Sequence, residues 1–115
     1  MEDRRLRKSE RIRKRKEFEN VLYNGFKGES ENFKVYVLIE EKNKKIGIIT
    51  KRKLGKAYRR NRIKRLLREV FRLNKGKIRE GAKIIVYVKK IPNNPCYKVV
   101  EEEILSLFEK MKILK

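Results

Sequence analysis

The chain has 115 residues, of which 35 are Lys or Arg and 15 are Asp or Glu, so its formal net charge is +20. This length predicts one domain, and the charge predicts a polyanionic partner, nucleic acid before an acidic membrane surface. Hydrophobic residues make up 39% of the chain and fall in periodic runs, which excludes a disordered polybasic tail. No apolar stretch approaches the roughly 18 residues of a membrane span, and no apolar run follows the basic N-terminus as it would in a secretory signal.

Catalysis by the side chains of this chain alone is disfavoured. The sequence contains no histidine, which is the commonest general base and the commonest zinc ligand. The one cysteine, Cys96, cannot form an internal disulfide and is compatible with a reducing compartment. We therefore expect a binding protein, and a cytoplasmic location is compatible with this cysteine.

Hydrophobic periodicity predicts the order helix, strand, strand, long helix, strand, helix. The expected bounds are a helix over residues 15–24, strands over residues 33–40 and 45–51, a helix over residues 57–74, a strand over residues 82–89, and a last helix after the two prolines. The run EEKNKK between the first two strands predicts a charged hairpin loop. Near the start of the last helix, Glu101, Glu102 and Glu103 suit the helix dipole.

These elements predict a small single-domain α+β sandwich, in which helices cover one face of a sheet and leave part of the other face open. The domain is expected to span residues 1–115, with residues 1–14 as a basic N-terminal segment that could be flexible. Two tracts, residues 4–16 and 51–77, carry most of the cations.

The long helix separates an apolar stripe from a basic row. The stripe, which must face the core, consists of Ile63, Leu66, Leu67, Val70 and Phe71. The row on the opposite side consists of Asn61, Arg65, Arg68 and Arg72, and it extends about 16 Å at 1.5 Å per residue. A row of this length reaches across several backbone phosphates.

Arg59 and Arg60 fall in line with the apolar stripe, one turn before it begins. Bare charges cannot be buried there, so we expect the helix start to extend beyond the core and to direct both arginines toward an external anion. An ordinary solvated face would alternate Lys with Glu, whereas this helix carries cations almost alone, and their mutual repulsion suggests a polyanionic partner. Arginine predominates, and its planar fork suits phosphate oxygens.

The residues of this region carry a resemblance to a known family. The run KLGKA at residues 53–57, followed by RRNRIKRLLRE at residues 59–69, resembles the signature of the bacterial ribonuclease P protein, with Arg60, Asn61 and Arg62 as its central motif. The similarity covers nearly the whole chain, from the basic lead-in RIRKRKEFENVLYNG to the strand IIVYVKK.

The resemblance implies a fold like that of ribosomal protein S5 domain 2, with a mixed sheet and a left-handed strand–helix–strand crossover, although general rules favour the right-handed form. It also implies a protein subunit of the endoribonuclease ribonuclease P, in which the RNA subunit performs the hydrolysis. Its partners would be this catalytic RNA and precursor tRNA, with no membrane and no obligate protein partner. Magnesium ions would be held mainly by the RNA subunit and the substrate.

Carried over by position, the resemblance implies two RNA-binding sets, no catalytic residue and no metal ligand. The catalytic RNA would be bound by Lys53, Lys56, Arg59, Arg60, Asn61, Arg62, Lys64, Arg65 and Arg68. The 5′ leader of precursor tRNA would be bound by Arg15, Phe18, Tyr36, Lys51, Lys89 and Lys90. Aromatic side chains among cations suit single-stranded RNA, because stacked bases bind without sequence choice.

Several alternatives remain open. Phe18 also fits a core position of the first helix, and Tyr36 also fits an ordinary half-buried strand tyrosine. The chain has Leu22 where the family often has a second aromatic residue, so its stacking platform would be smaller or completed by Tyr23. A ribosomal or other structural RNA-binding protein would explain the charge equally well, though not the Arg-Asn-Arg sequence. A protein-only nuclease and a helix-turn-helix DNA-binding protein fit less well.

Overall fold

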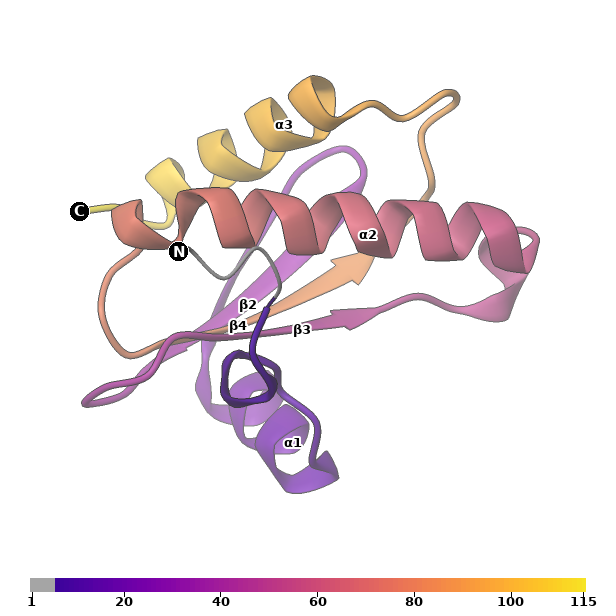
Figure 1. The fold of residues 1–115 in the computed structure, drawn as a ribbon. Coiled ribbons are helices and arrows are strands. Elements are labelled where there is room, and N and C mark those ends of the chain that lie inside the picture. The colour runs from indigo at the N-terminus through magenta and orange to yellow at the C-terminus, as the bar shows by residue number, and fades with distance from the viewer. Residues whose placement is uncertain (1–5) are drawn as a thin grey trace.

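A computed structural model describes residues 6–115 (Figure 1). The helices and strands are α1 (Arg15–Asn24), β1 (Phe26–Glu29), β2 (Phe33–Ile39), β3 (Lys45–Ile49), α2 (Ala57–Asn74), β4 (Ala82–Val88) and α3 (Tyr97–Lys110). Every predicted element with stated bounds begins at the expected residue, and both predicted helices also end where expected, while the strands end slightly early. None of the helices described here is both long and apolar enough to cross a membrane.

The sheet is mixed, with strand order β1-β2-β4-β3. β4 pairs antiparallel with β2 and parallel with β3, so the predicted hairpin between β2 and β3 is wrong. The reason lies in β4, whose residues are nearly all buried on both faces and therefore favour a central position. A parallel pair requires a crossover connection, which α2 provides.

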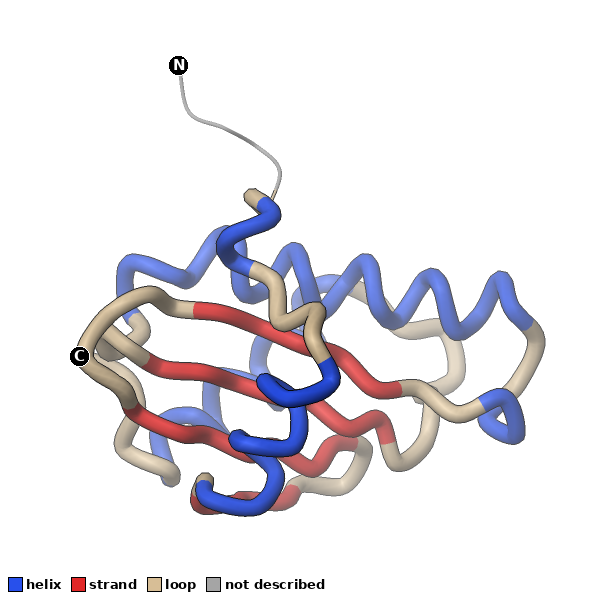
Figure 2. Tube along the Cα trace, turned by 90° about the horizontal axis from the view of Figure 1, so that it is seen from below, coloured by secondary structure: helices blue, strands red, loops and turns tan. Residues whose placement is uncertain are grey.

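The crossover from β3 through α2 to β4 is left-handed, as the resemblance implied. With the two strands pointing up and α2 toward the viewer, β4 lies to the left of β3 (Figure 1 and Figure 2). The α+β fold class with a mixed sheet is thus confirmed.

The edge strand β1 is absent from the expected elements. Its sequence, FKGE, is mostly exposed and shows no apolar alternation. It is a strand because it pairs antiparallel with β2, where Glu29 lies opposite Lys34. Pairing of this kind leaves no signal in the local sequence.

α2 and α3 cover one face of the sheet and α1 covers part of the other (Figure 2). The main core lies under α2 and α3. It includes four residues of the predicted α2 stripe, Ile63, Leu67, Val70 and Phe71, with Leu66 packed at its margin. A smaller cluster lies under α1, where Phe18, Leu22 and Tyr36 pack around Val21 and Ile85.

The predicted role of the acidic run in α3 is wrong, because α3 begins at Tyr97 and its first turn contains no acidic residue. Glu101 instead binds across the helix interface. Its Oε2 accepts a hydrogen bond from Nδ2 of the buried Asn74 at 2.9 Å and another from the Tyr97 hydroxyl. This contact fixes the C-terminal end of α2 to α3.

Gly47 allows α1 to approach the sheet closely. A Cβ atom at this position would lie 2.8 Å from Cε1 of Phe18 and 3.2 Å from Cβ of Ile12. Such contacts are too short to be accommodated without movement of the Phe18 ring. The missing side chain of Gly47 therefore sets how closely Phe18 lies against β3.

We expect Gly47→Ala to lower the free energy of unfolding by about 1–3 kcal/mol, because it overpacks the contact with Phe18. The matched control is Gly76→Ala, where a Cβ atom meets nothing within 4 Å. That control should be neutral or slightly stabilising. Urea denaturation of both variants measures the difference, and equal stabilities would contradict the close approach.

Burial, together with the hydrogen bond to Glu101, raises the pKa of Tyr97 to about 12 from an ordinary value of 10.0. A phenol with a raised pKa stabilises the fold below pH 10.0, and this contribution is lost as the pH rises toward 12. We expect Tyr97→Phe to be less stable at neutral pH by about 1–3 kcal/mol. Thermal melts against pH should show this difference shrinking between pH 10.0 and about 12, and a constant difference would contradict the assignment.

Candidate nucleic-acid interface

The N-terminal segment brings the two basic tracts together. Its backbone runs beside β3. Arg11 forms an isolated parallel β-bridge with Ile46, and the Ile12 N–H donates to the Ile46 carbonyl at 2.9 Å. Leu6 and Ile12 are buried, so this part of the segment is anchored at both ends. The predicted flexible segment also includes residues 1–5, which lie outside the described residues.

The predicted row on α2 lines one depression of about 420 Å³, which we call the basic groove. Its lining consists of Leu6, Arg11, Asn61, Arg65, Arg68, Glu69 and Arg72. The single acid, Glu69, is paired with Arg72. Burial, with the positive charge of Arg11 nearby, lowers the pKa of Arg68. The groove therefore brings like charges together and favours an anion between them.

The N-terminal turns of α2 extend past the ends of β3 and β4, as expected (Figure 1). Arg59 and Arg60 are both half-buried, and one donor of Arg60 is already used within the protein, because its Nε donates to the Gly55 carbonyl at 3.1 Å. Arg62 donates from Nε and Nη2 to the Pro95 carbonyl at 3.3 and 3.0 Å. The two arginines of the Arg-Asn-Arg motif thus also hold the loops on either side of α2.

A second depression, of about 640 Å³, lies on the opposite flank of α2 from the basic groove. It is lined by Tyr58, Arg59, Arg62, Asn93, Asn94 and Pro95. Tyr58 is 69% exposed and was not among the predicted site residues. The remaining predicted cations do not enter either depression: Lys53 and Lys56 are exposed before α2, and Lys64 is half-buried on its side.

The distribution of ion pairs is uneven along the chain. Within residues 6–115, no Lys or Arg from Lys51 to Arg68 forms an ion pair. Cations elsewhere, such as Lys45 and Lys75, pair with Glu17 and Glu10 at 2.7 and 2.8 Å. Every Lys and Arg from Lys51 to Arg68 is therefore unpaired within the described chain, as are some cations elsewhere, such as Arg13 and Lys98.

The face of the sheet that carries α1 holds most of the predicted leader residues. Phe18 and Tyr36 belong to the same cluster under α1, and both are half-buried. Each therefore has a packing role and an accessible edge. Arg15 is 92% exposed at the start of α1, and its Nε lies 3.0 Å from Glu19.

Beyond α1, a cross-strand row remains open on this face, which we call the open row. It consists of Lys34, Tyr87 and Ile49, which are paired across β2, β4 and β3, together with Lys51. The Lys51 ammonium lies 5.5 Å from the centre of the Tyr87 ring. Neither Lys34 nor Tyr87 was among the predicted site residues. Tyr87 and Lys89 lie on the same face of the predicted strand over residues 82–89, and this alternation was a signal that could have identified Tyr87.

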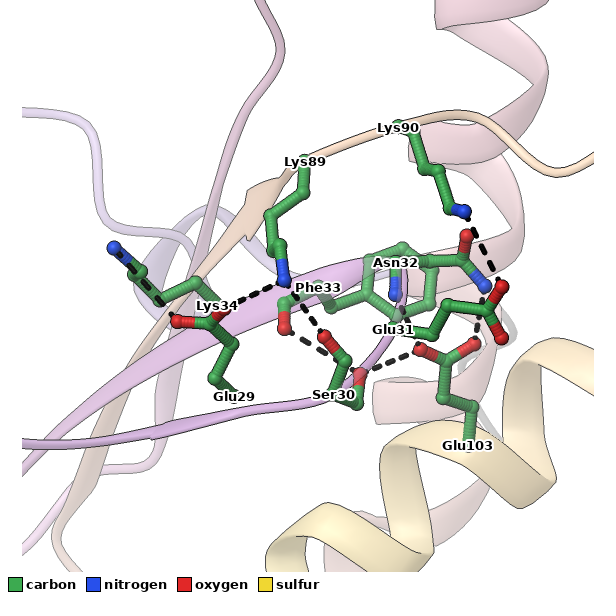
Figure 3. Close-up of polar contacts among 9 residues, drawn as sticks. All are labelled: Glu29, Ser30, Glu31, Asn32, Phe33, Lys34, Lys89, Lys90 and Glu103. Atoms are coloured by element: carbon green, nitrogen blue, oxygen red, sulfur yellow. Dashed lines mark hydrogen bonds and ion pairs between the residues drawn. The ribbon is translucent and has the colours of Figure 1, made fainter.

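The two lysines after β4 diverge. Lys89 reaches the same face as Lys34, where both approach Glu29, whereas Lys90 reaches Glu31 on the side of α3 (Figure 3). The structure therefore brings Lys89 to the open row and leaves Lys90 apart from it.

The basic groove and the face that carries α1 meet at the edge of β3. A depression of about 220 Å³ there is lined by residues of both, including Arg68 of α2 and Phe18 of α1. Arg11 lines this depression and the basic groove alike. No local pattern in the sequence marks Arg11 for this position.

The ribonuclease P family model matches residues 6–112. The ribonuclease P protein component of Dictyoglomus turgidum is 39% identical over 111 residues, covering 94% of this chain and 93% of that protein. That of Thermotoga maritima is 37% identical, covering 90% and 92%. The solved Staphylococcus aureus protein superposes with a TM-score of 0.84 at 26% identity, covering 94% of this chain and 100% of that chain. The Thermotoga maritima structure gives 0.78 at 36% identity, covering 88% and 96%. The chain belongs to the ribonuclease P protein family.

Proposed function

We propose that this chain binds the catalytic RNA of ribonuclease P and the 5′ leader of precursor tRNA, and so assists magnesium-dependent removal of the leader. Family membership makes it a component of an endoribonuclease holoenzyme. The observation that carries the proposal is the run of cations from Lys51 to Arg68, none of which has an acidic partner within residues 6–115.

The basic groove is the proposed contact with the catalytic RNA. Arg11, Arg65 and Arg68 line it without carboxylate partners in the described chain, so phosphates can occupy their donors without displacing an ion pair. Each phosphate that they neutralise releases condensed counterions, which favours binding most strongly at low salt. Arginine forks suit this role because they donate two parallel hydrogen bonds to phosphate oxygens.

The open row and the α1 cluster are the proposed contact with the leader. Tyr36 and Tyr87 offer aromatic surface on neighbouring strands, and Lys51 places a cation beside the Tyr87 ring. Base stacking contributes about 1–3 kcal/mol per base with little sequence preference. This chemistry suits leaders of varied sequence.

Magnesium belongs to the RNA and the substrate in this proposal. The described residues include no group of three or more His, Cys, Asp or Glu side chains that could hold a metal ion. The protein's part is to reduce repulsion between two polyanions, and therefore the magnesium concentration that cleavage requires.

Reconstituted cleavage of precursor tRNA at limiting magnesium tests this function. We expect the cognate RNA to cleave faster with the protein than without it, and the protein alone to be inactive. Replacing Arg65 and Arg68 by Gln should weaken binding to the catalytic RNA by about tenfold per charge, at about 1.4 kcal/mol for each charged hydrogen bond. It should also reduce the slope of log K against log salt by about 0.7–0.9 per phosphate contact.

The matched control replaces Lys98 and Lys110 by Gln, which removes the same charge from exposed positions on α3. Equal losses in both double variants would show that net charge, rather than the basic groove, determines binding.

Lys51→Gln tests the leader contact separately. We expect the holoenzyme to bind precursor tRNA about three- to tenfold more weakly, because one phosphate contact is lost, and to bind mature tRNA unchanged. Fluorescence titration of both tRNAs measures this. An equal effect on mature tRNA would place Lys51 outside the leader site.

A further inference from the structure

A carboxylate lies at one end of the open row. Glu29 is the last residue of β1 and lies opposite Lys34. Its Oε2 is 2.6 Å from the Lys89 ammonium, and its Oε1 is 4.0 Å from the Lys34 ammonium (Figure 3). The hydrogen bond from Lys89 lowers the pKa of Glu29, so the group is ionised at neutral pH.

The contact leaves Lys89 few free donors. Besides Glu29, its ammonium donates to the Ser30 carbonyl at 3.0 Å. An ammonium has three donors in all, and two of them are therefore used within the protein. A phosphate approaching Lys89 would meet a cation that is already neutralised and hydrogen-bonded.

The turn that follows Glu29 is held by α3. The carboxylate of Glu103 accepts hydrogen bonds from the Asn32 N–H at 2.9 Å, from Asn32 Nδ2 at 2.7 Å and from the Ser30 hydroxyl (Figure 3). The strand pairing of β1 fixes the other side of Glu29. The backbone that carries the Glu29 carboxylate is thus supported on both sides.

The opposite end of the open row differs in charge. Lys51 forms no ion pair within residues 6–115 and lies over the Tyr87 ring at 5.5 Å. The row therefore runs from an unpaired cation beside an aromatic ring to cations neutralised by Glu29. Single-stranded RNA that enters at Lys51 gains contacts at first and meets a negative charge at the far end.

We propose that Glu29 is a specificity-determining residue that limits how far single-stranded RNA can bind along the open row. In the free protein the Glu29 carboxylate pairs with the ammonium groups of Lys34 and Lys89, to which an RNA phosphate would otherwise bind. It also repels the phosphate backbone of any RNA that continues past Tyr87. This inference rests on the proposed leader binding. Its consequence is that only the leader nucleotides on the Lys51 side of Glu29 add affinity, whatever the total length of the leader.

Glu29→Gln tests the proposal, with Glu31→Gln as the matched control. Glu31 lies in the same turn and pairs with Lys90 at 3.2 Å, but on the side of α3. Both substitutions remove one negative charge from an exposed glutamate. The measurement is the affinity of the holoenzyme for precursor tRNAs whose leaders are lengthened one nucleotide at a time, each at several salt concentrations.

For the unaltered chain we expect affinity to stop rising at a short leader length. With Glu29→Gln it should continue to rise, reaching about three- to tenfold tighter binding for long leaders, as an exposed ion pair and one charge repulsion predict. The salt slope should steepen by about 0.7 for each added phosphate contact. Glu31→Gln should follow the unaltered chain, and adding Lys89→Gln to Glu29→Gln should remove most of the gain.

Three results would overturn the proposal. If the unaltered holoenzyme distinguishes leader lengths but Glu29→Gln gives the same curve, Glu29 does not limit binding along the open row, and leader binding itself still stands. If affinity is independent of any leader at all, both the leader contact and this inference fail. Equal gains from Glu29→Gln and Glu31→Gln would indicate a general charge effect and would also contradict the assignment to Glu29.

Discussion

The burial of one apolar stripe determines how this protein presents its charge. Ile63, Leu67 and Val70 of α2 are essentially inaccessible to solvent against the sheet and α3. A helix whose stripe is fixed in this way cannot rotate, so Arg65 and Arg68 must face away from the core. The hydrophobic core therefore selects which cations form the basic groove. In the proposed function, an RNA partner would offset the mutual repulsion of those cations.

The same sheet separates the two proposed RNA-binding surfaces and also connects them. The basic groove lies on the α2 side and the open row lies on the α1 side, and the two meet at the edge of β3. Arg11 contributes to the depressions on both sides of that junction. In the proposed function, a catalytic RNA on one side and a leader on the other would approach each other closest there, which is where repulsion between them most needs a cation.

Most of the architecture could be predicted from the sequence because its helices and strands are strongly periodic. What could not be predicted depends on partners remote in the chain. β1 forms only by pairing with β2, and the position of β3 follows from the burial of β4 on both faces rather than from the loop that precedes it. The left-handed crossover came from family resemblance alone.

The geometry of the candidate site was predictable to a similar degree. Helical spacing predicted a row that includes Asn61, Arg65 and Arg68, and these residues lie together along the basic groove. Arg11 was missed because nothing in its neighbourhood shows that it pairs with β3. The binding of Arg60 and Arg62 to loop carbonyls was missed because charge patterns do not reveal which donors a fold already uses.

The attachment of α2 has a mechanical consequence for docking. The helix is joined to α3 by Asn74, its last residue, whereas its first turns project past the sheet. A force applied by RNA at the projecting end would be opposed close by, where Arg62 binds the Pro95 carbonyl, and farther along by the buried stripe. Rigidity of the docked complex would thus depend on how α2 is packed as well as on its contacts with RNA.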